Sequence, residues 1–112
     1  MFNLDFSKIN YDSVAREFEE GVTLDIRPYP MSEEEIPVSN TSVPLKNQKK
    51  KWLYVVSGWN LKDAAGKNLP CNNEIKSKMF DFSQKLQTNK LIIWALNEAD
   101  KLRDEQEESI KN

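Results

Sequence analysis

The sequence contains no histidine and a single cysteine, Cys71, among its 112 residues. Histidine is the commonest general base and the commonest neutral metal ligand, so its absence removes the usual basis for acid–base catalysis and for a soft-metal site. One cysteine cannot form an internal disulfide, and this is typical of a reducing compartment. We therefore expect a non-enzymatic protein with no catalytic residues, no cofactor and no bound metal.

Long apolar runs and a strong excess of one charge are also missing. Sixteen basic and eighteen acidic residues give a net charge of −2, whereas nucleic-acid-binding proteins are usually strongly basic, so a nucleic-acid partner is disfavoured. No apolar run approaches the roughly 20 residues that a membrane-spanning helix needs. The N-terminus lacks the basic and apolar regions of a signal peptide. These features predict a cytoplasmic protein without membrane contact.

The first part of the chain, residues 1–30, predicts a strand–helix–strand unit. Apolar and polar side chains alternate over residues 2–6 and again over residues 22–26, as in half-buried strands. Between them, apolar residues at helical spacing followed by Gly21 predict a helix over about 12–20. Residues 31–45 are rich in proline and serine and predict a loop.

Residues 46–58 are compatible with either a helix or a strand. A lysine-rich start leads into an aromatic and β-branched run. Trp52, Val55, Val56 and Trp59 fall on one face of a helix, whereas the β-branched and aromatic composition favours a strand. We favour a helix that ends near Gly58, with Trp59 packed against the core. Its basic and aromatic start is better explained by a solvated helix end than by a nucleic-acid site.

Residues 59–71 are predicted to form a turn that joins the two halves of the chain. Asp63 is expected to accept hydrogen bonds from nearby backbone N–H groups, and Gly66 to adopt positive φ. The segment lacks the alternating acidic ligands of a calcium loop. Cys71 has no histidine partner and is expected to be a core or loop residue rather than a reactive thiol.

The remaining residues predict a helical hairpin over 72–104 and a solvated or disordered tail over 105–112. Asn72 or Asn73 can cap the first helix, and Thr88 the second. The first helix has a continuous apolar stripe made of Ile75, Met79, Phe82 and Leu86. The second is apolar nearly all round in its first turns, as a central buried helix would be. The predicted fold is therefore α+β within one domain: a small N-terminal β-sheet with a short helix, followed by a C-terminal helical hairpin.

Large aromatic side chains are the candidate protein-binding residues, because exposed aromatics often dominate protein interfaces. Three tryptophans are many for this length, and burial in the core is the competing explanation for each. The candidates are Trp52, Trp59, Phe80 and Trp94.

Three features in this order resemble small proteins encoded in the tail-morphogenesis regions of tailed phages and prophages. They are a strand running into Ile26-Arg27-Pro28-Tyr29-Pro30-Met31-Ser32, then Trp59 followed by Asp63-x-x-Gly66-x-x-Leu69-Pro70-Cys71-x-x-Glu74-x-Lys76, then a helix with Ala95, Ala99 and Leu102 before Glu107-Glu108 and Lys111-Asn112. The resemblance covers residues 22–112. The Ala64-Ala65 pair departs from it, because acidic residues are common in such turns.

Many proteins of that group are tail assembly chaperones, which bind the long, aggregation-prone tape measure protein while tail tube subunits polymerise around it. The resemblance implies such a non-enzymatic role in the cytoplasm of a bacterial host. The alternative is a small phage-encoded inhibitor that binds a host enzyme or defence complex. A homo-oligomer is compatible with both functions.

Overall fold

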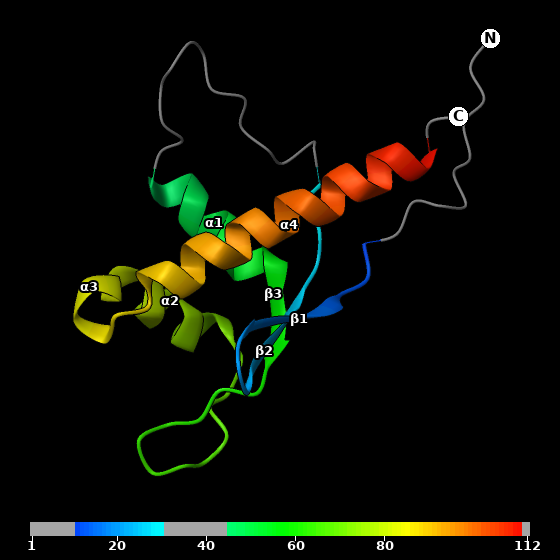
Figure 1. The fold of residues 1–112 in the computed structure, drawn as a ribbon. Coiled ribbons are helices and arrows are strands. Elements are labelled where there is room, and N and C mark those ends of the chain that lie inside the picture. Colours follow the sequence, from blue (N-terminus) through cyan, green and yellow to red (C-terminus); the bar gives the residue numbers. More distant parts are fainter. Residues whose placement is uncertain (1–10, 31–44, 111–112) are drawn as a thin grey trace, which may run out of the picture.

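The computed structural model describes residues 11–30 and 45–110, and it confirms the predicted α+β class (Figure 1). An antiparallel sheet of three strands is combined with helices that end in the long C-terminal helix α4. In chain order, the elements are β1 (Val14–Glu19), β2 (Val22–Ile26), α1 (Leu45–Val55), β3 (Val56–Trp59), α2 (Asn73–Asp81), α3 (Ser83–Leu86) and α4 (Asn89–Ile110).

The central strand of the sheet is β2, which confirms the strand predicted over residues 22–26. Leu24 and Ile26 are fully buried at alternate positions of this strand, as the period of two along a strand requires. Leu24 pairs with Trp59 of β3, and Ile26 pairs with Val56. The strand therefore contributes its apolar side to the core of the protein.

The helix predicted over residues 12–20 is wrong, because this segment forms strand β1 and pairs antiparallel with β2. Gly21 has φ +81° and turns the chain into a hairpin instead of ending a helix. Cross-strand hydrogen bonding and the packing of Phe18 against α4 outweigh the local helical spacing. The strand predicted over 2–6 and residues 31–44 of the predicted loop lie outside the described residues.

Residues 46–58, for which both a helix and a strand were considered, contain both structures: helix α1 is followed directly by strand β3. The last carbonyl groups of a helix have no hydrogen-bond donor within it. In α1, these carbonyl groups accept hydrogen bonds from residues outside the helix. Arg27 donates its backbone N–H to the Val55 carbonyl at 2.8 Å and its Nε–H to the Tyr54 carbonyl at 2.7 Å. Lys76 Nζ donates to the Leu53 carbonyl at 2.7 Å. These bonds let α1 end without a glycine.

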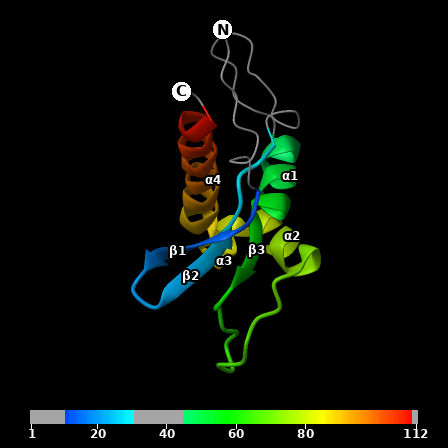
Figure 2. The same ribbon diagram turned by 90° about the vertical axis from the view of Figure 1, so that its right-hand side faces the viewer.

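The loop between β3 and α2 contains the predicted turn. Asp63 Oδ1 accepts hydrogen bonds from the backbone N–H groups of Ala65 and Lys67, at 2.9 and 3.0 Å, and Gly66 has φ +80°. Both predictions for this turn are confirmed. The indole of Trp59 donates to the Leu69 carbonyl at 2.8 Å and ties the two ends of the loop together. Figure 2 shows the loop extending away from α1 and α4.

The first helix after the loop begins as predicted, but the helical region divides differently. Asn72 caps α2 by accepting from the N–H of Ile75 at 2.9 Å. Phe82 then leaves helical geometry, with φ −112° and ψ 30°, so the apolar stripe breaks and both Phe82 and Leu86 are exposed. Thr88 precedes α4, and its hydroxyl donates to the Met79 carbonyl at 2.7 Å.

The core lies where α1, α4 and β2 meet, and α4 crosses α1 in Figure 1. Within the described parts of the chain, no helix is long and apolar enough to cross a membrane. The buried apolar residues are Leu24, Ile26, Tyr29, Trp52, Val55, Val56, Met79, Leu91, Ile92, Ala95, Ala99 and Leu102.

Candidate functional site

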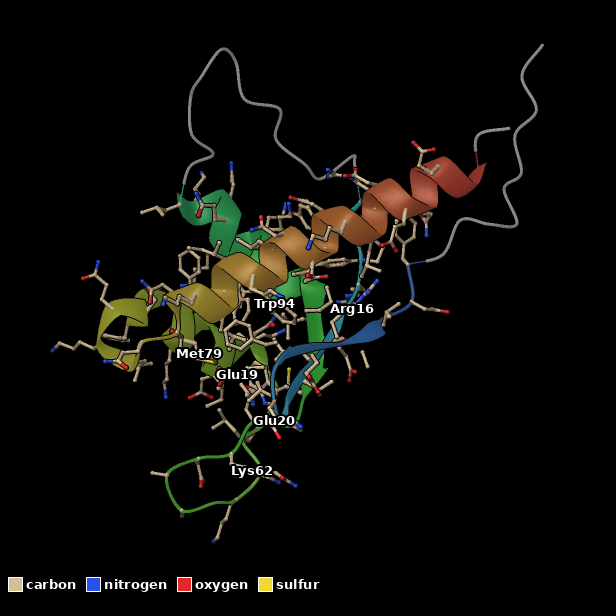
Figure 3. All side chains as sticks on the ribbon, in the orientation of Figure 1. Arg16, Glu19, Glu20, Lys62, Met79 and Trp94 are labelled. Carbon is tan, nitrogen blue, oxygen red and sulfur yellow. The ribbon has the colours of Figure 1, made fainter. Side chains whose placement is uncertain are left out.

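The four predicted protein-binding residues occupy different environments. Trp52 is fully buried, and its indole donates to the Lys76 carbonyl at 2.9 Å, so it is a core residue. Trp59 is half-buried beside the loop. Trp94 is half-buried between α4 and the sheet (Figure 3), in edge-to-face contact with Phe18 at a centroid distance of 5.2 Å. Phe80 is half-buried and lines a surface groove.

This groove, called here the three-helix groove, lies between the start of α1, the α2–α3 junction and the start of α4. Its volume is about 770 Å³. Helices α2 and α4 both pack on α1, and the short helix α3 follows α2 at the edge of the groove. The lining residues are Leu45, Lys46, Gln48, Lys49, Phe80, Asp81, Phe82, Ser83, Gln84, Lys85, Asn89, Ile92 and Ile93.

Large apolar side chains of the groove are open to solvent. Leu45 is 71% exposed, Phe82 56% and Ile93 57%. Isolated exposed apolar residues are ordinary, but several that line one hollow are typical of an interaction site. The sequence placed Phe82 on a buried stripe and did not single out Leu45 or Ile93. The available signal for Ile93 was the first turns of α4, which are apolar nearly all round and so have more apolar faces than a core can cover.

The charges around the three-helix groove are mainly positive. Among the described residues, Lys46, Lys49 and Lys85 line it together with one carboxylate, Asp81. Lys49 Nζ lies 3.0 Å from both carboxylate oxygens of Asp81, and this ion pair joins α1 to α2. The groove therefore combines an apolar floor with a basic rim, which is complementary to an amphipathic segment with acidic flanks.

A second hollow, called here the basic cavity, has a volume of about 780 Å³ and shares no lining residue with the three-helix groove. It lies beside the C-terminal end of α1, where strand β2 leads into Tyr29 and helix α2 begins. Its lining residues are Arg27, Tyr29, Pro30, Lys50, Leu53, Tyr54, Val56, Ser57, Asn73 and Lys76.

Lys76, which lines the basic cavity, and Cys71, which does not line it but interacts electrostatically with Lys76, have perturbed pKa values. Burial lowers the pKa of the Lys76 ammonium below 10.5; Cys71 opposes this change, and the charge of Arg27 adds to it. Burial also raises the pKa of the Cys71 thiol above 9.0, against the influence of Lys76 and with that of Asp25. A thiol with a raised pKa is mainly protonated at neutral pH, which agrees with the structural role that the sequence predicts for Cys71.

The described residues contain no group of three acidic or cysteine side chains that could hold a metal ion. Comparison with protein-family models, curated proteins and solved structures found no match.

Proposed function

We propose that this protein is a non-enzymatic binding protein that holds an amphipathic helix of a client protein in its three-helix groove. The observation that carries the proposal is the exposure of Leu45, Phe82 and Ile93 along one hollow with a lysine-rich rim. An amphipathic helix presents anchors at successive turns to such a groove. Acidic residues at the edges of that helix would meet Lys46 and Lys85.

The specific client that we propose is the tape measure protein of a tailed phage, with this chain as its tail assembly chaperone in the host cytoplasm. The support for this step is the sequence resemblance, which joins the strand end at Ile26, the Trp59–Lys76 spacing and the Ala95–Leu102 helix. A long client of this kind needs its apolar segments covered until the tail tube forms around it. The three-helix groove offers an apolar surface of that type.

Co-expression with the tape measure protein encoded beside this chain tests the proposal. The chain should keep the client in the soluble fraction and co-purify with it. Ile93→Glu and Phe82→Glu should abolish the complex and leave the domain folded, because both side chains are already more than half exposed. Leu86→Glu is the matched control, since Leu86 is 53% exposed but does not line the groove.

A client that remains insoluble, with no complex formed, contradicts the chaperone proposal. An inhibitor of a host protein would use the same apolar groove but would capture a defined host enzyme in the absence of phage proteins. Loss of that capture in Ile93→Glu, with capture intact in Leu86→Glu, would assign the groove to a host target instead.

A further inference from the structure

We propose that the basic cavity binds one small oxyanion, a phosphate or carboxylate group, between Arg27 and Lys76. Of the ten described residues that line it, three are basic and none is acidic. This site goes beyond the proposed client groove, because the two hollows have no described lining residue in common.

Arg27 is held in a fixed orientation at the cavity. Its Nε–H donates to the Tyr54 carbonyl, and its guanidinium carbon lies 4.0 Å from the centroid of the Tyr54 ring. A guanidinium group has five N–H donors in a planar fork, and the bond to the Tyr54 carbonyl uses one of them. No hydrogen bond or ion pair of its two terminal nitrogens to the described residues is present. An oxyanion can therefore accept from both of them without displacing an existing bond.

Lys76 is the second cation of the cavity, and it is only 5% exposed. Its Nζ donates to the carbonyl oxygens of Leu53 and Val56, each at 2.7 Å. An ammonium group has three N–H donors, so one remains after these two bonds. Burying a cation without a carboxylate partner is unfavourable, and a bound anion would offset that cost.

Among the described residues, the positive charge of Arg27 and Lys76 exceeds the negative charge that they contact at the end of α1. Arg27 and Lys76 satisfy carbonyl groups at the end of α1, and a helix C-terminus carries only about half a negative charge. The two full positive charges of Arg27 and Lys76 therefore exceed the partial negative charge of that helix end. The charge of Arg27 also helps to lower the pKa of Lys76, so the two cations repel each other across the site. A small anion between them would relieve this repulsion.

Neutral polar groups beside the two cations also suit an oxyanion. The Ser57 hydroxyl and the Asn73 side chain line the same cavity, and both can donate to oxygen. A volume of about 780 Å³ accommodates a small molecule or one acidic side chain. The shared chemistry is thus a single oxyanion, supplied either by a free small molecule or by an acidic residue of a bound peptide.

The test is an amide-resolved NMR titration of the full chain with inorganic phosphate, with acetate, and with the peptide acetyl-(Ala-Glu)3-amide, at ionic strength held constant with NaCl. Saturable shifts at the Arg27, Asn73 and Lys76 amides are expected with at least one probe. The probe that binds more tightly identifies the free ion or the peptide as the source. Arg27→Gln should weaken binding by about tenfold or more, as loss of a charge-assisted bidentate contact does. Lys67→Gln, an exposed change of the same charge on the loop, should leave binding unaltered.

A second measurement uses the unaltered protein. Phosphate should slow the modification of Arg27 by phenylglyoxal more than that of Arg16, which pairs with Glu105 at 3.5 Å outside the cavity. Equal responses of Arg27→Gln and the unaltered protein, non-saturable shifts with every probe, or equal protection of both arginines would each overturn the proposal.

Discussion

The indole nitrogen of Trp52 lies 2.9 Å from the carbonyl oxygen of Lys76, and this hydrogen bond joins α1 to α2 inside the core. The bond has a counterpart in the opposite direction, because the Lys76 ammonium donates to the carbonyls of Leu53 and Val56. Helix α1 thus donates to the backbone of α2 through Trp52, and α2 donates to the backbone of α1 and β3 through Lys76. The junction of α1, β3 and α2 is consequently held by side-chain-to-backbone hydrogen bonds as well as by apolar packing.

Trp52→Phe should lower the free energy of unfolding by about 1–2 kcal/mol, because it removes a buried hydrogen bond and part of a fully buried ring. Urea denaturation followed by circular dichroism measures this loss. Trp59→Phe is the matched control, and it should cost less because Trp59 is only half-buried. Equal losses of unfolding free energy in the two variants would show that the buried Trp52 hydrogen bond adds no extra stability.

Lys76→Met should change how stability depends on pH. Folding lowers the pKa of Lys76, so just below 10.5 the unfolded chain binds more protons than the folded one. The contribution of Lys76 to the free energy of unfolding therefore rises as the pH increases through that window, by about 1.4 kcal/mol for each unit of pKa difference. Lys76→Met should abolish this rise in urea titrations.

The titration of Cys71 changes the stability in the opposite direction to that of Lys76. Cys71 must therefore be replaced in both proteins that are compared. Its folded pKa lies above 9.0, so its contribution to stability falls as the pH increases above that value. Both proteins in the Lys76 experiment should therefore carry Cys71→Ser. A flat difference between the two titration curves would contradict the prediction.

The thiol of Cys71 should react slowly with iodoacetamide in the folded protein at pH 8. Burial raises its pKa, and the thiolate is the reactive form. The rate should be severalfold lower than in the urea-unfolded chain, measured by mass spectrometry. Removing the nearby positive charge with Lys76→Met should slow the reaction further, whereas a faster reaction in that variant would show that access, not pKa, limits it.

Gly58→Ala should be destabilising in a manner that depends on Asp25, its partner across the β2–β3 pair. A β-carbon at Gly58 would lie 2.5 Å from Asp25 Oδ2, so the carboxylate must rotate away, at a cost of about 1 kcal/mol. In an Asp25→Ala background, the same change should be neutral or slightly stabilising, because alanine reduces the entropy of the unfolded chain. A double-mutant cycle by urea denaturation measures the coupling, and additive effects would refute it.

The correctly predicted parts of the fold are those that depend on local chemistry. Asp63 and Gly66 shape their turn through bonds within five residues, and Asn72 caps the helix that follows it. The strand at 22–26 is recognisable from the alternation of apolar and polar side chains. In each case the residues that decide the structure are close in sequence, so the pattern is visible without the rest of the chain.

The missed parts depend on distant partners. Strand β1 forms because it pairs with β2 and because Phe18 meets Trp94 of α4, 76 positions further along. The end of α1 is set by Arg27 and Lys76, which come from other elements. For the same reason, neither the three-helix groove nor the basic cavity could be read from spacing, since each collects residues from several separate segments.

The three tryptophans have a practical consequence for following this protein. Trp52 sits in the core, Trp59 at the base of the loop, and Trp94 between α4 and β1. Indole fluorescence responds to the polarity around each ring, so two tryptophan-to-phenylalanine changes at a time would leave a single reporter. Three such proteins would show, by light emission alone, whether the centre, the loop and the hairpin lose their structure together or in sequence.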